Sequence, residues 1–368
     1  MIRNTDVFII GGGPSGLACA IAARQRGLDV VIADGAEPPI DKACGEGMMP
    51  ATLAALRDLG IVIGAAQGIS LRGMRFVNGT DQVQADFPDG PGLGLRRLAL
   101  HEKLIERARE LGVQFLWKTP VTGLCRTGVV AQGQVIGARW IVGADGIRSR
   151  VRKWSRLEGR SVARSRYARR RHYRIAPWSD YVDVHWGQGV QAYVTPLSES
   201  DVCVVLVSRD PRVSFALLET QFPELQHRLA GGSLLSAERG AMTATRQLES
   251  VYRGDVALLG DASGSVDATT GEGLCLSFCQ AAALAEALAE GDLSRYQSAH
   301  RTLARRPAVM ARLLLLLDAH PTLRGQLLRT LSKHPELFAR LLALNAGTAS
   351  PFDIVSTGTL LGWKMVAA

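Results

Sequence analysis

A glycine-rich turn between two apolar stretches constrains the fold of this chain more than any other feature of its sequence. Residues 6–10 read as a strand, and residues 14–26 read as an Ala-rich helix that ends at Gly27. Residues 29–33 follow as a second apolar strand. A strand, a helix and a further strand in this order form a parallel crossover unit. The sequence therefore predicts the beginning of a Rossmann-type α/β domain.

The turn itself has the pattern G-x-G-x-x-G, at Gly11, Gly13 and Gly16. The first glycine of such a turn permits a sharp bend, the second lets a pyrophosphate approach the backbone, and the third lets the helix pack on the sheet. The amides at the helix N-terminus favour an anion. Asp34 ends the second strand, where its carboxylate can accept a hydrogen bond from a ribose hydroxyl. We therefore predict a dinucleotide site at this turn. The remaining candidate contacts in this unit are Pro14, Ser15 and Gly35.

Two further strand ends carry polar, glycine-rich sequences. Residues 143–152, "GADGIRSRVR", lead from a strand into a short helix, and residues 258–274, "LLGDASGSVDATTGEGL", lead from another strand into a long apolar helix. An aspartate after a strand can accept from a ligand hydroxyl, and amides at a helix N-terminus can face an anion or a polar ring edge. Each segment alone is equally well explained as a capped helix start. The candidate binding residues in these segments are Asp145, Gly146, Gly260, Asp261, Gly271, Gly273 and Leu274.

The stretch "DKACGEGMMP", residues 41–50, combines glycines, a cysteine and two methionines. Glycines allow the backbone to approach a ligand closely, and methionines supply adaptable apolar contact. We interpret Cys44 as a small neighbour of the ligand, with a redox-active thiol as the alternative. The candidate binding residues here are Cys44, Gly45, Glu46, Gly47 and Met48.

In this order and at these distances, the segments resemble the para-hydroxybenzoate hydroxylase-like FAD-dependent oxidoreductases over residues 5–290. That superfamily includes aromatic hydroxylases, flavin-dependent halogenases and geranylgeranyl reductases. The resemblance implies FAD, with the G-x-G-x-x-G turn on its pyrophosphate and Asp34 on the adenosine ribose. It also implies Asp261 near the ribityl chain or the pyrophosphate, and residues 268–274 beside the isoalloxazine.

Two more residues gain an expected role from the resemblance. Asp145 is implied to contribute to the binding of FAD or of a nicotinamide cofactor. Arg97, in "RRLALHEKL", stands where such enzymes often carry an arginine before a helix, so a contact with the flavin is implied. A surface charge is the alternative interpretation of Arg97.

Details of the motifs distinguish the branches of the superfamily. "GDASGSVDATTGEG" is most similar to the reductase and halogenase branch, and "DKACGEGMMP" resembles the Cys-Gly loop of the reductases. Ala268 stands where that branch usually has a proline, and Gly264 stands where aromatic hydroxylases commonly have a histidine. The halogenase motif W-x-W-x-I-P does not occur in the sequence.

Strand character dominates residues 165–210, and helical patterns dominate the chain after residue 295. We therefore expect an α/β fold: a Rossmann-type FAD-binding domain with an inserted antiparallel β-sheet substrate domain and a helical C-terminal region. The expected boundaries are 1–160 and 250–295 for the discontinuous FAD-binding domain, 161–249 for the β-rich domain, and 296–368 for the helical region.

The net charge of +9 is concentrated between residues 139 and 174, which hold twelve arginines and one lysine. We interpret this segment as a solvated face with a few phosphate-binding arginines, since no nucleic-acid motif accompanies it. The six cysteines show neither a CxxC pair nor zinc spacing, which fits reduced thiols in the cytoplasm and no metal site. No apolar run is long enough to span a bilayer, so we expect no transmembrane segment and leave peripheral membrane contact open.

These observations together predict an FAD-dependent oxidoreductase with NAD(P)H as its electron donor. By a narrow margin we favour an oxygen-dependent monooxygenase that hydroxylates an aromatic, polyketide or other lipophilic small molecule. The alternative is a geranylgeranyl reductase-like enzyme that reduces a double bond; a halogenase or a non-catalytic flavoprotein is less favoured. The sequence identifies no acid or base. The β-rich domain contains four residues that we interpret as packed or surface side chains: His172, His185, Tyr193 and Trp186.

Overall fold

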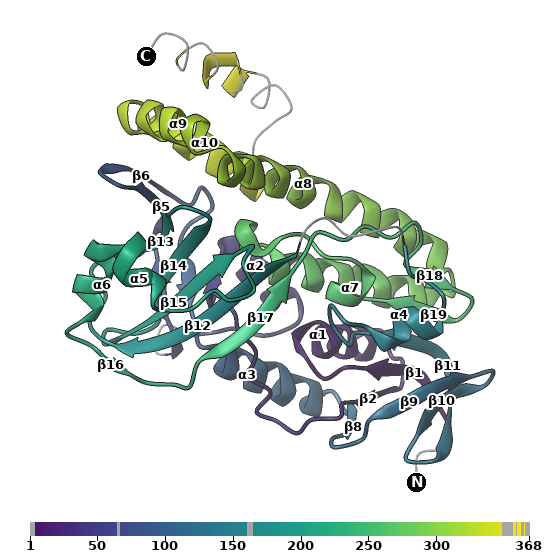
Figure 1. Cartoon of the computed structure of the whole chain (residues 1–368). Helices are drawn as coiled ribbons and strands as arrows, with labels where there is room; N and C mark the ends of the chain where they lie inside the picture. The colour runs from purple at the N-terminus through teal and green to yellow at the C-terminus, as the bar shows by residue number, and fades with distance from the viewer. Residues whose placement is uncertain are drawn as a thin grey trace.

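A mainly parallel sheet brings the three motifs of the sequence to one edge (Figure 1). The computed structural model describes residues 4–64, 67–159, 165–347, 356, 357, 359–361 and 364. The first sheet has the order β18-β19-β11-β1-β2-β8, with β10 paired to β11 and β9 to β10. Its strands are β1 (Asn4–Ile10), β2 (Val30–Ala33), β8 (Gln114–Leu116), β9 (Val121–Cys125), β10 (Gly128–Ala131), β11 (Gln134–Gly143), β18 (Tyr252–Arg253) and β19 (Val256–Leu258). Because β1, β2, β11 and β19 run parallel, their carboxyl ends, where the motifs begin, lie together.

Helices pack on this sheet, and together they form the hydrophobic core of the first domain. Helix α1 packs between the sheet and α7, which its small side chains allow: Ala18, Ala20 and Ala22 are fully or almost fully buried. By length and composition α7 could cross a membrane, yet half of it is buried against α1 and α8, which is the packing of a core helix. The helices of this part are α1 (Pro14–Arg24), α2 (Pro50–Asp58), α3 (Arg97–Glu110), α4 (Arg150–Trp154) and α7 (Gly273–Glu290), with 3-10 turns at Gly260–Ser263 and Ala268–Thr270.

The second sheet is mainly antiparallel and has the order β16-β12-β15-β14-β13-β5-β6, with β17 paired to β12. Its strands are β5 (Gly73–Asn78), β6 (Asp81–Asp86), β12 (Arg166–Arg174), β13 (Tyr181–Trp186), β14 (Val190–Pro196), β15 (Asp201–Ser208), β16 (Ser233–Leu234) and β17 (Arg239–Thr243). Two short helices, α5 (Leu217–Gln221) and α6 (Pro223–Leu229), pack on one face of it. An antiparallel sheet was expected, but β5 and β6 come from the segment expected within the first domain. The parallel pairing of β5 with β13 places them here, a contact between residues about a hundred positions apart that no local pattern signals.

A small sheet connects the stretch at residues 41–50 to both larger parts. β3 (Gly47–Met48) and β4 (Ile69–Leu71) both pair with β7 (Gly92–Gly94). Gly94 lies against the second sheet, where an added Cβ would come within 1.9 Å of the Pro196 carbonyl oxygen. The stretch is therefore held between the two domains.

The C-terminal helices cover the second sheet near β5 and β6 (Figure 1). They are α8 (Leu293–Ala319), α9 (Pro321–Lys333) and α10 (Pro335–Ala346). Leu328, Leu331 and Phe338 pack with Val83 and Trp186 in one buried cluster. The helical region is thus a cap on the protein core. Most of the expected helical segment beyond residue 347 lies outside the described residues.

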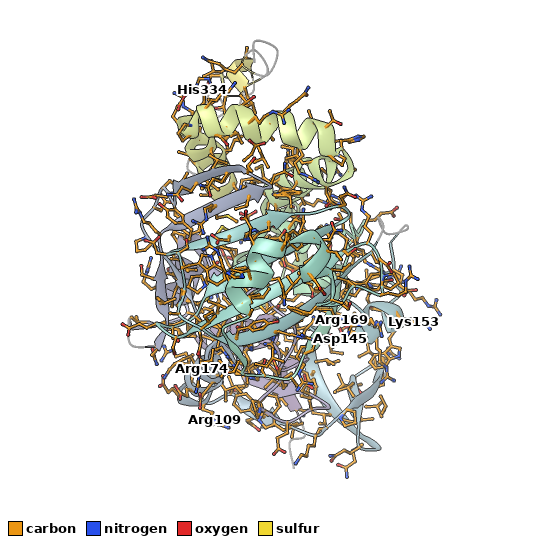
Figure 2. The ribbon with its side chains drawn as sticks, turned by 60° about the vertical axis from the view of Figure 1, so that its left-hand side comes forward. Arg109, Asp145, Lys153, Arg169, Arg174 and His334 are labelled. Atoms are coloured by element: carbon orange, nitrogen blue, oxygen red, sulfur yellow. The ribbon has the colours of Figure 1, made fainter. Side chains whose placement is uncertain are left out.

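The basic segment at residues 139–174 has both exposed and buried members. Lys153 on α4 and Arg174 at the end of β12 are exposed (Figure 2). In contrast, Arg152, Arg166 and Arg170 are each at most 3% exposed and pair internally. Part of the apparent surface charge therefore stabilises the interior.

A buried ion pair joins the two domains. Arg166 Nη1 donates to Asp267 Oδ1 at 3.0 Å, and both side chains are only 1% exposed. Asp267 also accepts from the amide of Thr269, so it fixes the loop before α7. Arg166 Nη2 donates to Gln191 Oε1 on β14. The second sheet thereby holds the loop that follows β19.

We expect Asp267→Ala to lower the free energy of unfolding by about 3–5 kcal/mol, because Arg166 is left buried without its counter-charge. Guanidinium denaturation followed by circular dichroism measures the change. Asp210→Ala is the matched control; its partner Arg212 is exposed, so the midpoint should not change. Equal midpoints for Asp267→Ala and the unsubstituted protein would contradict a structural role for the buried pair.

Candidate active site

A cavity of about 700 Å³ lies between the carboxyl edge of the first sheet and the second sheet. Every candidate binding residue from the sequence except Gly16 lines it. These residues are Gly11, Gly13, Pro14, Ser15, Asp34, Gly35, Cys44, Gly45, Glu46, Gly47, Met48, Arg97, Asp145, Gly146, Gly260, Asp261, Gly271, Gly273 and Leu274. Gly16 instead faces the turn, where an added Cβ would come within 1.9 Å of the Gly11 carbonyl oxygen. Gly16 therefore allows helix α1 to pack closely on the turn.

The glycine turn leaves room for a ligand at the N-terminus of α1. Gly11 has φ +118°, and an added Cβ there would lie 2.3 Å from the Ala144 carbonyl oxygen. Gly13 has no atom within 4 Å of an added Cβ, so it borders open space in the cavity. Gly13 is also the N-cap, and no side chain caps the helix. The first amides of α1 are thus available to an anion.

Asp34 is fixed by backbone amides. Its Oδ2 accepts from the Gly12 amide at 2.7 Å, and its Oδ1 accepts from the Ala36 amide at 2.8 Å. Each oxygen keeps a second lone pair for a ligand hydroxyl. Buried His101 on α3 contacts the Gly12 carbonyl oxygen through Nε2 at 2.8 Å. Burial lowers the pKa of His101, so the ring is neutral at pH 7. Sequence reasoning missed His101 because it lies 89 residues from its partner.

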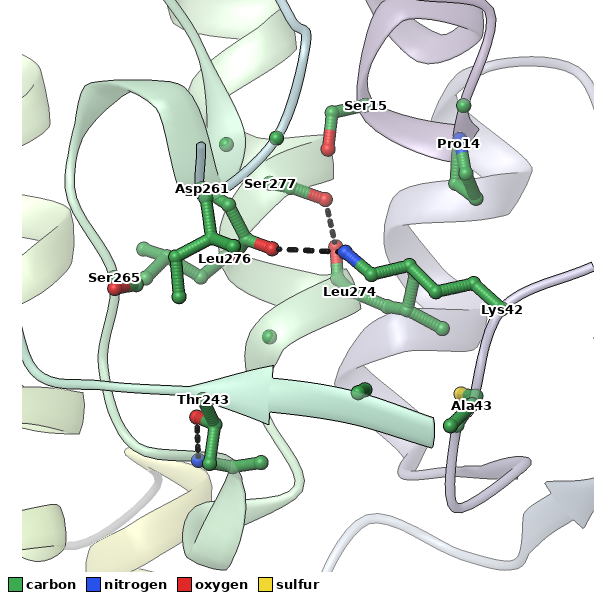
Figure 3. Close-up of a pocket in the computed structure, with 18 of the residues that line it drawn as sticks. Pro14, Ser15, Lys42, Ala43, Thr243, Asp261, Ser265, Leu274, Leu276 and Ser277 are labelled. Atoms are coloured by element: carbon green, nitrogen blue, oxygen red, sulfur yellow. Dashed lines mark hydrogen bonds and ion pairs between the residues drawn. The ribbon is translucent and has the colours of Figure 1, made fainter. Parts of the chain in front are cut away.

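Lys42 and Asp261 form an ion pair across the cavity (Figure 3). Their side chains approach to 3.5 Å and are about half exposed. The pair connects the 41–50 stretch to the loop after β19. A ligand hydroxyl in the cavity could therefore compete with Lys42 for the carboxylate oxygens of Asp261.

Asp145 lines the cavity, but its carboxylate already binds the start of α4. Oδ1 accepts from the Ser149 hydroxyl at 2.5 Å, and Oδ2 accepts from the amides of Arg150 and Val151. This is the capped helix start that the sequence left open as an alternative. Asp145 positions the turn at Gly146, which also lines the cavity.

Alternate residues of β12 face the cavity side, as the twofold period of a strand requires. Ala168 lines the cavity, whereas Tyr167 and Tyr173 pack on the opposite face. Arg170 and His172, on the cavity side, both reach Glu46. Within the basic segment "RYARRRHYR", alternate polar side chains therefore point into the protein.

Glu46 is the centre of a buried charge cluster. It is 3% exposed and has a φ of +60°. Its Oε2 lies 2.6 Å from His172 Nε2, and its Oε1 accepts from Arg170 Nη1 and from the Arg97 amide. Burial alone would raise the pKa of Glu46, but His172, the Arg97 amide and Arg170 outweigh it, and the net pKa is lowered. Glu46 therefore stays ionised at neutral pH and anchors the 41–50 stretch to β12.

The same cluster has the composition of a metal site, since Glu46, His172 and Cys203 approach closely. However, the oxygens of Glu46 are already used by an arginine, an amide and a histidine. Burial raises the pKa of the Cys203 thiol well above its usual range, so the sulfur stays protonated. The cluster therefore serves as a structural anchor.

The part of the cavity formed by the second sheet is mainly apolar. The second sheet contributes Met74, Val182, Val205, Val207 and Met242, and Leu71 of β4 lies on the same apolar side. Tyr193 also lines it, and its hydroxyl donates to Gln191. His185 and Trp186 do not line it; His185 packs on Phe222 and Trp186 joins the cluster with the C-terminal helices.

Glu272 is a cavity residue that sequence reasoning missed. It is 5% exposed at the N-terminus of α7 and accepts from Arg306 Nη2 at 3.3 Å. Burial raises its pKa to about 7, against the opposing effect of Arg306. Its placement in "TTGEGL", before a long apolar helix, is the local signal; its burial depends on α8 and is not visible in the sequence.

The residues present fit FAD. The open space at Gly13 and the uncapped start of α1 suit a pyrophosphate, and Asp34 suits a ribose. The start of α7 likewise has no side-chain cap. Among the described residues, the buried Arg97 Nε and Thr269 Oγ1 have no partner, although both residues line the cavity. Such groups are ready to bind polar atoms of a ligand.

We expect Gly13→Val to abolish FAD binding while the protein still folds. The valine finds no protein atom at its Cβ, and the backbone at φ −76° accepts it, but its side chain enters the space for the pyrophosphate. The FAD absorbance of the purified protein and its circular dichroism measure the two effects. Gly123→Val on β9, equally open but not a cavity residue, is the control and should purify with FAD. Normal FAD content in Gly13→Val would rule out the pyrophosphate position.

Comparison with known proteins gives the same cofactor. Residues 4–170 match the family model described as an FAD binding domain. A menaquinone reductase of Mycobacterium tuberculosis is 27% identical over 321 residues, covering 79% of this chain and 78% of that protein. A digeranylgeranylglycerophospholipid reductase of Methanococcoides burtonii is 25% identical over 320 residues, covering 78% and 76%. A 6-methylpretetramide 4-monooxygenase of Streptomyces rimosus is 34% identical over 170 residues, covering 41% and 40%.

Solved structures with the same fold include proteins of several activities. A flavin-dependent brominase superposes with a TM-score of 0.81 at 20% identity, covering 94% of each chain. A p-nitrophenol 4-monooxygenase of Pseudomonas putida superposes with a TM-score of 0.79 at 19% identity, covering 94% of this chain and 99% of that one. The motifs, the cavity and these similarities lead to one conclusion: residues 4–170 form an FAD binding domain, and the chain has the fold of these two solved structures.

Proposed function

We propose that the protein is an FAD-dependent reductase that saturates a carbon–carbon double bond in a lipophilic, isoprenoid-like molecule. The observation that carries the proposal is the apolar surface of the second sheet within the cavity. It faces the glycine turn and the start of α7, which border the same space. A flat hydrocarbon chain or ring can lie against this surface, with its reacting bond toward the flavin end.

Bound FAD would supply the two-electron transfer, and the protein residues would position the substrate and exclude water. Leu71, Met74 and Val205 offer contact without hydrogen-bonding groups, which suits a polyene. The amides at the start of α7, by Gly273 and Leu274, face the cavity and favour negative charge on a bound ring. The 41–50 stretch, anchored through Glu46, closes the side of the cavity near Met48.

The extent of the similarity favours reduction over oxygen insertion. The two reductases compared above match over more than three quarters of this chain, whereas the monooxygenase matches over 41% of it. The sequence alone favoured a monooxygenase over a reductase by a narrow margin. We now propose the reductase as the first candidate and the monooxygenase as the second.

A monooxygenase is the second candidate. The 34% identity to the 6-methylpretetramide 4-monooxygenase exceeds the identity to either reductase, although it is limited to 170 residues. Tyr193 and Thr195 supply hydroxyl groups to the cavity and suit an aromatic substrate as well. We propose NAD(P)H as the electron donor in either case, and a lipophilic or aromatic small molecule as the binding partner.

Anaerobic turnover distinguishes the two candidates. With NAD(P)H and menaquinone in detergent micelles, and without oxygen, we expect a product that stays two mass units heavier than the substrate after the extract is reoxidised in air, which returns any quinol to the quinone. Mass spectrometry of the extracted lipid measures it, and the Gly13→Val variant is the control without FAD. A product sixteen mass units heavier that forms only with oxygen would overturn the reductase and establish the second candidate.

A further inference from the structure

Glu272 lies between the main cavity and a second, very small one. The second cavity has a volume of about 10 Å³ and lies beside α10. Among the described residues, Met49, Phe87 and Glu272 line both cavities. Neither a thioether nor a phenyl ring carries an exchangeable proton. Glu272 is therefore the shared side chain that can pass a proton from one cavity to the other.

The hydrogen bonds of Glu272 are incomplete on the side away from Arg306. Its Oε1 accepts from Arg306, but Oε2 is buried without a partner within the described chain. Asn345 Oδ1, on α10, is also buried without a hydrogen-bond partner among the described residues. Asn345 lines the second cavity. A volume of about 10 Å³ is at the lower limit for one water molecule. Each of these acceptors needs a donor, which a protonated acid or a water in the second cavity can supply.

Three charged or titratable groups lie around this acid. Arg306 on α8 is its ion-pair partner, Cys275 lies one turn further along α7, and Asp89 borders the second cavity after β6. A hydrogen bond with Cys279 raises the pKa of Cys275, so that thiol stays neutral. Burial raises the pKa of Glu272 to about 7. The carboxyl group is thus present in both protonation states near neutral pH, as a proton carrier must be.

We propose that Glu272 delivers the proton that the reduction consumes and regains it from solvent through the second cavity. This inference rests on the proposed reductase function. Saturation of a double bond adds two electrons and two hydrogens. Bound FAD would supply the hydride to one carbon, and the Glu272 carboxyl group would supply the proton to the other. The carboxylate that remains is held by Arg306 until a water in the second cavity returns a proton.

One test needs no substrate. Because folding raises the pKa of Glu272, its contribution to stability is fully present below pH 4.5 and is lost as the pH rises through 7. The unfolding constant of the purified flavoprotein, relative to that of Glu272→Gln, should therefore rise on the order of 100-fold between pH 5 and 8. Glu286→Gln, an exposed acid on the same helix, is the control and should follow the unsubstituted protein. Parallel pH curves for Glu272→Gln and the unsubstituted protein would overturn the proposal.

The second test follows the proton during turnover. We expect Glu272→Gln to keep its FAD and its rate of flavin reduction by NAD(P)H, while reoxidation by menaquinone slows by about 10²–10⁴-fold. Asn345→Leu, which fills the second cavity, should leave the first turnover unchanged and slow the later ones. Unchanged reoxidation in Glu272→Gln would overturn the role of the acid. If the unsubstituted protein does not reduce menaquinone, the reductase function fails, and the pH test still decides whether Glu272 titrates as described.

Discussion

The arrangement of this active site depends on buried charges carried by one strand, β12. Arg166 binds the loop before α7 through Asp267, and Arg170 and His172 bind the 41–50 stretch through Glu46. Burying a charge is costly unless it is paired, so these pairs form only when both loops are in place. The second sheet therefore organises the parts of the first domain that border the cofactor, in addition to covering them.

This arrangement also separates two kinds of surface within one cavity. The flavin end is formed by backbone amides, glycines and a few fixed carboxylates, whereas the far side is formed by aliphatic side chains of the second sheet. The first surface suits the cofactor, and the second decides which molecule can lie beside it. Glu272 belongs to the boundary between them, which is where a proton would be needed.

How far the sequence predicts such a site depends on the range of the interactions. The glycine turn, Asp34 and the loop at Asp261 were predicted because strand, turn and helix follow one another within a few residues. The inward arginines of β12 were taken for a solvated face, because their partners lie about a hundred residues or more away. The acid at Glu272 was missed for the same reason: its burial comes from α8, and Arg306 lies 34 residues further on. Local pattern thus predicts where a ligand binds, and tertiary packing determines which side chains can act on it.

The position of β5 and β6 has a consequence for the synthesis of the chain. These strands are made early, but β13, which pairs with β5, follows about a hundred residues later. The helix that covers β6 comes later still, since Ser332 bonds to Gln82 across 250 positions. A nascent chain therefore carries an unpaired strand edge until β13 is made, and an uncovered apolar face until α9 is made. Folding of this domain is complete only after α9 and α10 have been made, and such long-range contacts favour slow folding and exposure to aggregation or chaperone binding on the ribosome.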